Sequence, residues 1–259
     1  MEINKIIQGD CIKEISKLED NSVDLIIADP PYNLSKDFGN KSDVWSTPQE
    51  WLDWSKKWID ICCQKLKPNG SIFIYGIHHY LCYIQVYLYE KDLKYRRQII
   101  WHYENGFSGY KKSPSATYEP LLWFSKSDKY TYHQIREPYK STSRLKNKIV
   151  KNGKVWTPNP EGKHAGDVWN IPVLAGKRFA NEKVNHPTQK PLKICNRIIK
   201  HFSNEGDMVL VPFGGSGSEC VSAKSLNRNF LGIEINPEYV EIGNQRLKEL
   251  DNNPLLKES

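Results

Sequence analysis

A short apolar run that ends in two prolines is the feature that most constrains the fold of this chain. Residues 23–28 (VDLIIA) are rich in β-branched side chains and follow polar residues, a pattern that predicts a buried strand. Asp29-Pro30-Pro31-Tyr32 comes directly after it. Each proline has a fixed φ and no N–H, and it pushes the residue before it into an extended conformation. The strand is therefore expected to end in a rigid, open site.

The four residues after this strand combine two hydrogen-bond acceptors with a flat ring. The Asp29 carboxylate is one acceptor, and the carbonyl of Pro30, held still beside Pro31, is the other. Tyr32 adds a surface on which a planar group can stack. This combination suits a planar base with an exocyclic amino group, because such a group has two N–H donors. We expect these four residues to be catalytic.

Apolar periodicity predicts that strands and helices alternate along most of the chain. Strands are expected at residues 3–7, 23–28, 71–75, 98–102, 121–125, 208–211 and 230–235. Helices are expected at residues 12–18, 48–66, 80–89, 192–202, 218–226 and 239–250. Such alternation indicates one α/β domain over residues 1–259, with a mainly parallel sheet and helices on both of its faces.

A polar segment and a tryptophan-rich helix follow the Asp29 motif. Residues 33–46 are polar and predict a loop, for which a lid and a passive linker are equally good interpretations. The helix that follows carries Trp51, Trp54 and Trp58 at steps of three and four residues. This spacing indicates core packing rather than a ligand site.

The net charge of +7 is concentrated in one part of the chain. Residues 126–200 hold 17 Lys/Arg and 5 Asp/Glu, a net +12, whereas residues 1–125 and 201–259 carry −1 and −4. Periodicity fades over residues 126–185, where little regular structure is expected and Tyr and Trp recur. Long irregular stretches in compact domains are usually functional. This segment is therefore the predicted contact for a polyanion.

Composition bounds the other functions. No apolar stretch is long enough for a membrane span or a signal peptide, so a cytoplasmic protein is expected. The six cysteines show no metal-binding spacing and mostly lie in apolar runs. We therefore expect reduced core thiols and no metal site.

A glycine-rich turn between a strand and a helix predicts a nucleotide site. Pro212-Phe213-Gly214-Gly215-Ser216-Gly217 follows the strand at 208–211, and Glu234 ends the next strand 19 residues after Gly215. An acid at about that separation, roughly 20 residues, is placed to bind ribose hydroxyls. Glycines let a ligand approach the backbone closely.

The type of nucleoside follows from what this turn lacks. Cys220 stands where the last glycine of the dinucleotide pattern belongs, which argues against an oxidoreductase, and the lysine of a P-loop is missing. An adenosine ligand without a polyphosphate fits better, and S-adenosylmethionine is such a ligand. Lys190, in the stretch from His186 to Pro191, is a candidate partner for its carboxylate.

Together these motifs resemble the β-class amino-methyltransferases of DNA. The resemblance rests on Asp29-Pro30-Pro31-Tyr32, on the glycine turn, on the stretch from His186 to Pro191 and on residues 8–10 (QGD). The order also matches, since the catalytic strand comes first, the basic insertion next and the cofactor turn last. The resemblance implies a Rossmann-like, S-adenosylmethionine-dependent methyltransferase fold with this permuted order.

The resemblance also implies roles for single residues. Asp10 and Cys11 would contact the adenine of the cofactor, Glu234 its ribose and Lys190 its carboxylate. The cofactor-binding set is completed by the following residues: Asp29, Pro212, Phe213, Gly215, Ser216, Gly217 and Ile235. Residues 126–185 would contain the target-recognition region. The chain departs from the family at Val211, where an acidic residue usually precedes Pro-Phe.

The implied reaction is methyl transfer to the N6 amine of an adenine flipped out of double-stranded DNA. Asp at the first motif position is usual in the adenine enzymes of the family, while cytosine-N4 methylation is the runner-up because both bases present the same amine geometry. Val211 motivates a third hypothesis, a catalytically silent DNA-binding subunit. A homodimer and a cognate restriction endonuclease are the further partners that the resemblance suggests.

Overall fold

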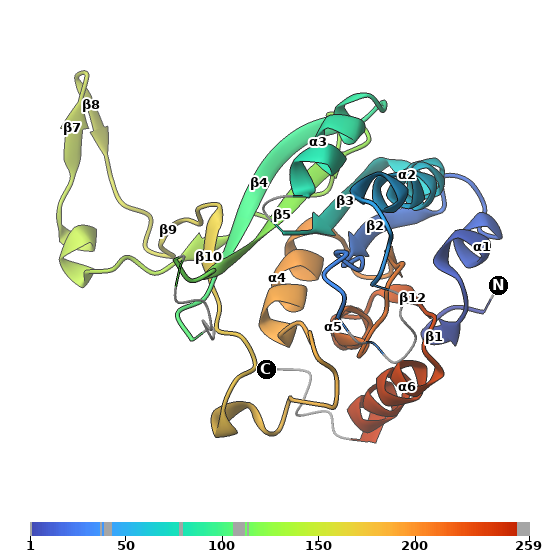
Figure 1. The fold of residues 1–259 in the computed structure, drawn as a ribbon. Coiled ribbons are helices and arrows are strands. Elements are labelled where there is room, and N and C mark those ends of the chain that lie inside the picture. Colours follow the sequence, from blue (N-terminus) through green and yellow to red (C-terminus); the bar gives the residue numbers. More distant parts are fainter. Residues whose placement is uncertain are drawn as a thin grey trace.

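The computed structural model describes residues 2–36, 38, 43–77, 80–105, 112 and 114–252. Its centre is an eight-stranded sheet, whose strands run parallel except for β5 (Figure 1). The strands across the sheet are, in order, β1 (Lys5–Gln8), β12 (Asn229–Glu234), β11 (Met208–Val211), β2 (Val23–Ala28), β3 (Leu66–Tyr75), β5 (Tyr118–Ser125), β4 (Lys94–His102) and β10 (Val168–Asn170). The mainly parallel sheet predicted from the sequence is confirmed.

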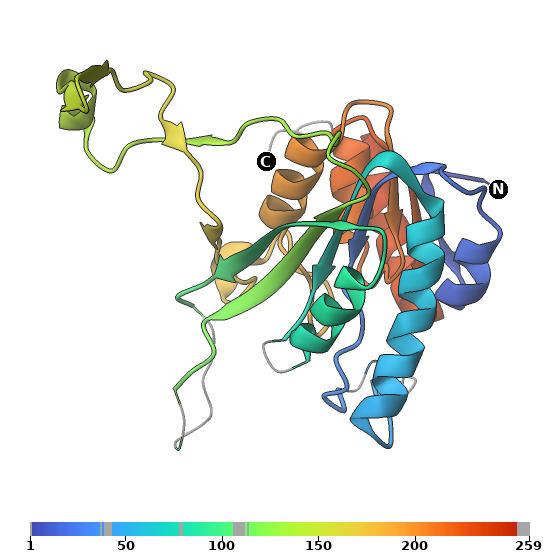
Figure 2. The same cartoon turned by 90° about the horizontal axis from the view of Figure 1, so that it is seen from above.

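Helices cover both faces of the sheet, as predicted (Figure 2). One face carries α1 (Cys11–Ser16), α2 (Pro48–Lys65) and α3 (Leu81–Tyr89); the other carries α4 (Leu192–Phe202), α5 (Ser218–Ser225) and α6 (Pro237–Asn252). Alternate residues of β2 explain the two cores, since successive strand side chains point to opposite faces. Ile26 packs with Trp58 on the first face, and Ile27 packs with Ile198 on the second.

The centre of the sheet contains the point where the strand order reverses. β11 and β2 are parallel neighbours there, with Leu210 beside Ile26. From β2 the chain proceeds through α2 to β3 on one side, and from β11 it proceeds through α5 to β12 on the other. Ligands of open α/β sheets bind outside the carboxyl ends of the strands at such a point. Asp29 and the glycine turn begin at these two carboxyl ends.

Most predicted elements lie within a few residues of their observed bounds, but the start of β3 differs. The sequence predicted a helix over residues 48–66 and a separate strand at 71–75, whereas β3 begins at Leu66 and includes Pro68. The pairing with β2 jumps from Val23–Leu66 to Leu25–Ser71. The proline-containing segment therefore forms an irregularity within the strand, where a residue without an N–H is tolerated.

The segment 126–185 contains more regular structure than expected. β10 lies inside it and joins the main sheet beside β4, with Trp169 opposite Trp101. The prediction of an irregular segment is wrong for these three residues, because strand pairing extends the core over them. The remaining elements are small: β6 (Arg136–Glu137) with β9 (Lys163–His164), β7 (Ile149–Lys151) with β8 (Lys154–Trp156), and the 3-10 turns Thr142–Lys146 and Lys177–Phe179.

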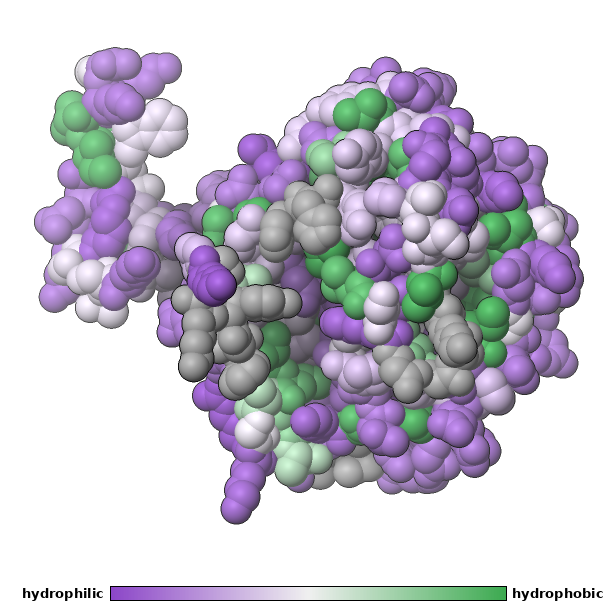
Figure 3. Space-filling model, in the orientation of Figure 1, coloured by the Kyte–Doolittle hydropathy of each residue, from purple (hydrophilic) through white to green (hydrophobic). Residues whose placement is uncertain are grey.

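The β7–β8 hairpin forms an arm, residues 138–160, that stands away from the body in both ribbon views (Figures 1 and 2). Its strand residues are all exposed. In Figure 3 the arm is hydrophilic over most of its surface, with one small apolar area. As for membranes, none of the helices in the described ranges is both long and apolar enough to cross one.

Candidate active site

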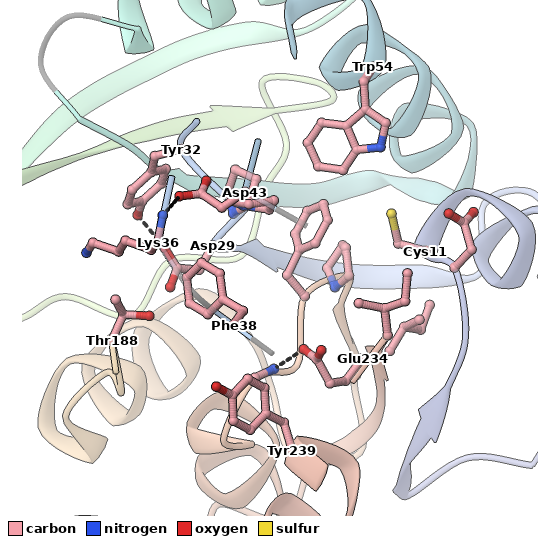
Figure 4. Close-up of a pocket in the computed structure, with 18 of the residues that line it drawn as sticks. Cys11, Asp29, Tyr32, Lys36, Phe38, Asp43, Trp54, Thr188, Glu234 and Tyr239 are labelled. Atoms are coloured by element: carbon pink, nitrogen blue, oxygen red, sulfur yellow. Dashed lines mark hydrogen bonds between the residues drawn. The ribbon is translucent and has the colours of Figure 1, made fainter. Parts of the chain in front are cut away.

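The carboxyl ends of β1, β12, β11 and β2 surround a cavity of about 360 Å³. Most of the predicted site residues line it, namely Asp10, Cys11, Asp29, Pro30, Pro31, Tyr32, Pro212, Phe213, Gly215, Glu234 and Ile235. Figure 4 shows Glu234 and Cys11 at one end and Asp29 and Tyr32 at the other. The cavity thus joins the predicted nucleoside corner to the Asp29 motif.

The glycine turn needs glycine at two positions. Gly215 has a φ of +49°, and a Cβ there would lie 3.1 Å from the His186 Nε2 atom. Gly217 has a φ of +80°, and its Cβ would meet the Ile6 side chain at 2.7 Å. Both positive φ values disfavour other residues. The turn can therefore lie close to β1 and to the cavity wall at once.

Ser216 and Gly217 take part in the turn without lining the cavity. The Ser216 carbonyl accepts a hydrogen bond of 2.7 Å from the buried guanidinium of Arg246. Gly217 precedes the first turn of α5 as its N-cap. Neither of these two predicted cofactor residues is among the described residues that line the cavity, and the hydrogen bond from Arg246 fixes the turn at Ser216.

Glu234 is fixed at the end of β12 by two backbone groups. Its Oε2 atom accepts from the Gly215 N–H and its Oε1 atom accepts from the Asn236 N–H, both at 2.8 Å. Burial raises the pKa of this carboxyl, while the backbone hydrogen bonds oppose that shift. Each carboxylate oxygen has two lone pairs, so Glu234 keeps acceptor capacity for hydroxyl groups in the cavity.

Part of the cavity wall consists of aromatic and uncharged side chains. Phe213 packs on Trp54 at 5.7 Å, and His186 meets Tyr239 edge-on at 4.5 Å between ring centroids. Burial lowers the pKa of His186 to about 4, so its ring is uncharged near neutral pH. Burial likewise raises the pKa of the Cys11 thiol to about 12. Such walls suit a flat, uncharged ring system.

The loop at 33–46 is tied down on both sides of the cavity. The buried Asp43 carboxylate accepts from the backbone N–H groups of Asn33, Leu34 and Lys36 at 2.6, 3.0 and 2.9 Å. Across the cavity, the side-chain amide of Asn236 donates to the Phe38 carbonyl at 2.7 Å. The described residues of this loop that line the cavity are Lys36, Phe38, Asp43, Val44 and Trp45. Residues 37 and 39–42 lie outside the described residues, so the lid stays a prediction.

Asp29 is held by two neighbours. The Tyr32 hydroxyl donates to its Oδ1 atom, and the Lys190 ammonium lies 2.8 Å from its Oδ2 atom. Lys190 is not among the described residues that line the cavity, and its side chain is 5% exposed. The structure thus places the Lys190 ammonium against the Asp29 carboxylate, whereas the sequence analysis expected Lys190 to bind the carboxylate of the cofactor.

Some residues that line the cavity were missed by the sequence analysis. Trp54 lies in the tryptophan stripe of α2, where Trp51 and Trp58 are core residues as predicted. Thr188 and Tyr239 also line the cavity, as do parts of the 33–46 loop. The only available signals were the position of Thr188 within the His186 to Pro191 stretch and that of Tyr239 shortly after Glu234.

The site and fold define a nucleoside-binding α/β enzyme, and comparison with known proteins gives its family. A model of the family described as DNA methylase matches residues 23–245. The chain belongs to this family, in the β class of DNA amino-methyltransferases.

Two relatives and two solved structures show the extent of the similarity. Type II methyltransferase M1.MboII of Moraxella bovis is 39% identical over 262 residues, which cover 98% of this chain and 100% of the relative. DNA adenine methyltransferase YhdJ of Escherichia coli (strain K12) is 36% identical over 252 residues, or 95% and 83% of the two chains.

The structure of M1.HpyAVI in complex with SAM has a TM-score of 0.63 at 25% identity and covers 94% of this chain and 98% of its own. The PvuII DNA methyltransferase, titled cytosine-N4-specific, has a TM-score of 0.69 at 18% identity, with 95% and 89% covered. At that identity the second structure supports the fold alone. The predicted Rossmann-like methyltransferase fold is confirmed.

Proposed function

We propose that this DNA methyltransferase transfers a methyl group from S-adenosylmethionine to the exocyclic N6 amine of an adenine in DNA. One observation carries the proposal: the Asp29 carboxylate lines the same cavity as Glu234, an acid at the position that binds ribose hydroxyls in nucleotide-binding folds. S-adenosylmethionine is the cofactor of the family, and one relative, YhdJ, is named as an adenine enzyme.

The cavity residues fit this cofactor. Glu234 offers acceptor lone pairs for ribose hydroxyls, Asp10 and Cys11 would contact the adenine ring, and Phe213 would line the methionine portion. The turn at Gly215 allows the methionine portion to approach the backbone. When bound, S-adenosylmethionine supplies a methyl group on a positively charged sulfur.

The Asp29 motif would supply the chemistry that the base needs. The lone pair of an aromatic amine is delocalised into its ring, which makes it a poor nucleophile. Hydrogen bonds from the two N–H groups to Asp29 and to the Pro30 carbonyl would localise that lone pair and stabilise the nitrogen as it becomes positive. Tyr32, whose hydroxyl now occupies Asp29 Oδ1, would release it and stack on the base.

Base identity is argued from the motif. Asp29 at the first position favours adenine within the family that the chain resembles. Cytosine-N4 methylation stays the alternative, since a cytosine amine makes the same two hydrogen bonds. A base in a duplex cannot reach this cavity, so either base must be flipped out, at a cost of a few kcal/mol.

DNA contacts would come from the segment 126–185, the proposed target-recognition region. Its arm, residues 138–160, carries six Lys/Arg and no Asp/Glu. Charge of this sign neutralises phosphates, and a two-stranded ribbon such as β7–β8 fits the major groove. A homodimer and a cognate restriction endonuclease complete the proposal and rest on the family resemblance. A cytoplasmic location is also proposed, and it rests on the composition of the chain.

Val211 supports a second candidate, a silent DNA-binding subunit. Its side chain is buried in the core under the glycine turn, at the position where the family usually has an acid. Intact Asp29 and Tyr32 at the cavity favour the active enzyme. Calorimetric titration with S-adenosylmethionine separates the two, since a silent subunit would not bind it, alone or with DNA.

Analysis of the product tests the proposal directly. Purified protein is incubated with DNA and methyl-labelled S-adenosylmethionine, and the DNA is then digested to nucleosides for mass spectrometry. We expect label in N6-methyladenine; label in N4-methylcytosine would favour the alternative base, and unlabelled DNA would contradict the enzyme.

The same assay tests the role of Asp29. Asp29→Ala should abolish methyl transfer and leave DNA affinity nearly unchanged, because the acceptor is lost but the basic segment is intact. Asp92→Ala removes an exposed carboxylate elsewhere and serves as the control. An active Asp29→Ala variant would refute the assigned role.

A further inference from the structure

Glu119 of β5 lies beside the Asp29 motif, although neither the motif nor the cavity lining includes it. The Lys190 ammonium lies 3.2 Å from Glu119 Oε2 and 2.8 Å from Asp29 Oδ2. One ammonium therefore bridges two carboxylates from different strands. We call Asp29, Lys190 and Glu119 the acid–lysine–acid bridge.

The bridge is enclosed by aromatic rings. The Lys190 nitrogen lies 5.8, 5.0 and 5.8 Å from the ring centroids of Tyr32, Tyr75 and Trp101. Burial by itself lowers the pKa of Lys190, but Asp29 and Glu119 outweigh it and raise the pKa above its ordinary value. Lys190 is thus a permanent cation, and the surrounding rings keep water from screening its charge.

The charge balance explains why two acids are needed. Asp29 and Lys190 alone would form a neutral pair, and a neutral pair is a weak acceptor for a nitrogen that becomes positive. With Glu119 the three groups carry a net charge of −1, and the buried Glu219, which also interacts with Lys190 and Asp29, makes the balance more negative when it is ionised. The shared ammonium then fixes the Asp29 carboxylate without cancelling its negative charge.

The bridge also fixes the orientation of Asp29. Lys190 holds its Oδ2 atom, so that Oδ1, the atom that now accepts from Tyr32, is the one presented to an incoming amine. From this geometry we propose that Glu119 is a positioning residue for methyl transfer, acting through Lys190 on Asp29. The proposal rests on the proposed function, in which Asp29 accepts a hydrogen bond from the target base.

This assignment differs from a structural role and from a cofactor-binding role in what it predicts. If Lys190 bound the cofactor carboxylate, loss of Glu119 would change the affinity for S-adenosylmethionine. If Glu119 were only structural, its loss would change the melting temperature and not the chemistry. A positioning role predicts a slower chemical step at unchanged affinities.

The test compares Glu119→Gln with wild type and with Glu241→Gln, an exposed control on α6. Single-turnover methyl transfer is measured with saturating S-adenosylmethionine and a DNA that the wild type methylates. We expect Glu119→Gln to be slower by at least about tenfold, with both dissociation constants within about twofold. Glu119→Asp, which keeps the charge, should be faster than Glu119→Gln.

Each contrary result overturns the proposal. A Glu119→Gln variant with the wild-type rate removes the positioning role, as does a rate loss matched by weaker cofactor binding. Folding is checked by circular dichroism at the assay temperature. If Glu119→Gln does not fold, the test uses Glu119→Asp. A folded Glu119→Asp variant whose loss of affinity for S-adenosylmethionine equals its loss of single-turnover rate overturns the proposal. Activity of the wild type itself shows separately whether the proposed function holds.

Discussion

Glu219 is a buried acid whose pKa is raised by burial and by the nearby Asp29 carboxylate. Glu219 lies in the first turn of α5, just after the glycine turn, and its Oε1 atom has no hydrogen-bond partner in the described part of the chain. Burial, with the negative charge of Asp29 adding to it, raises its pKa from 4.5 to about 7. Near neutral pH this acid is therefore only partly ionised.

This shift predicts a stability that depends on pH. Between about pH 4.5 and 7 the folded chain keeps a proton on Glu219 that the unfolded chain has released, so the free energy of unfolding falls as pH rises. Glu219→Gln has no such proton. Its stability relative to wild type should rise from pH 5 to pH 8, by at most about 3 kcal/mol. Urea unfolding at both pH values measures this, and equal differences at the two pH values would contradict it.

At the scale of elements, the loop over the cavity depends on Asp43. A carboxylate that accepts three backbone N–H bonds replaces a turn's own hydrogen bonding, and each such bond contributes about 1.5–3 kcal/mol. Asp43→Ala should therefore loosen the loop and weaken binding of S-adenosylmethionine by about tenfold or more.

Calorimetric titration measures this effect. Asp43→Asn is the matched variant, because its one remaining oxygen retains part of the acceptor capacity, and it should bind with intermediate affinity. DNA affinity should be unchanged in both variants. An Asp43→Ala variant with wild-type cofactor affinity would show that the loop does not shape the cavity.

The same scale shows what the sequence could and could not predict. The strand at 23–28 and the helix at 192–202 were placed correctly because a continuous apolar run and a helical apolar periodicity are local signals. β10 is three residues long, with only Trp169 buried, which is too short for periodicity to appear. Its strand conformation comes from pairing with β4.

Within the site, the same distinction holds. Asp29, the glycine turn and Glu234 were found because their chemistry requires particular residue types in a particular order. Glu119 reaches Lys190 only because β5 pairs with β3, a contact between distant parts of the sequence. Tyr239 lines the cavity because of how α6 packs, and this packing leaves no motif.

At the scale of the whole molecule, the arm carries a cluster of positive charge that lies apart from the cavity. If Lys148, Lys151 and Lys154 contact phosphates, replacing all three with Ser should reduce the slope of log K against log salt concentration by roughly 2.7, at about 0.9 per contact. Cofactor affinity should stay constant. The control replaces Lys13, Lys57 and Lys248, exposed lysines of the body, and should leave the slope unchanged.

DNA binding measured by fluorescence anisotropy at several salt concentrations gives both slopes. Equal slopes for the arm variant and the wild type would place the main phosphate contacts elsewhere on the molecule. A reduced slope of log K against log salt concentration in the body variant would lead to the same conclusion.

The two strands that meet at the reversal point lie far apart in the order of synthesis. β2 and the Asp29 motif leave the ribosome early, whereas β11, the glycine turn and Glu234 follow roughly 180 to 200 residues later, about ten to forty seconds at usual elongation rates. If Asp29 and the glycine turn have the roles proposed above, a chain terminated before β11 has the amine acceptor but lacks the place for the methyl donor. Such an incomplete product of translation is then expected to leave DNA unmethylated.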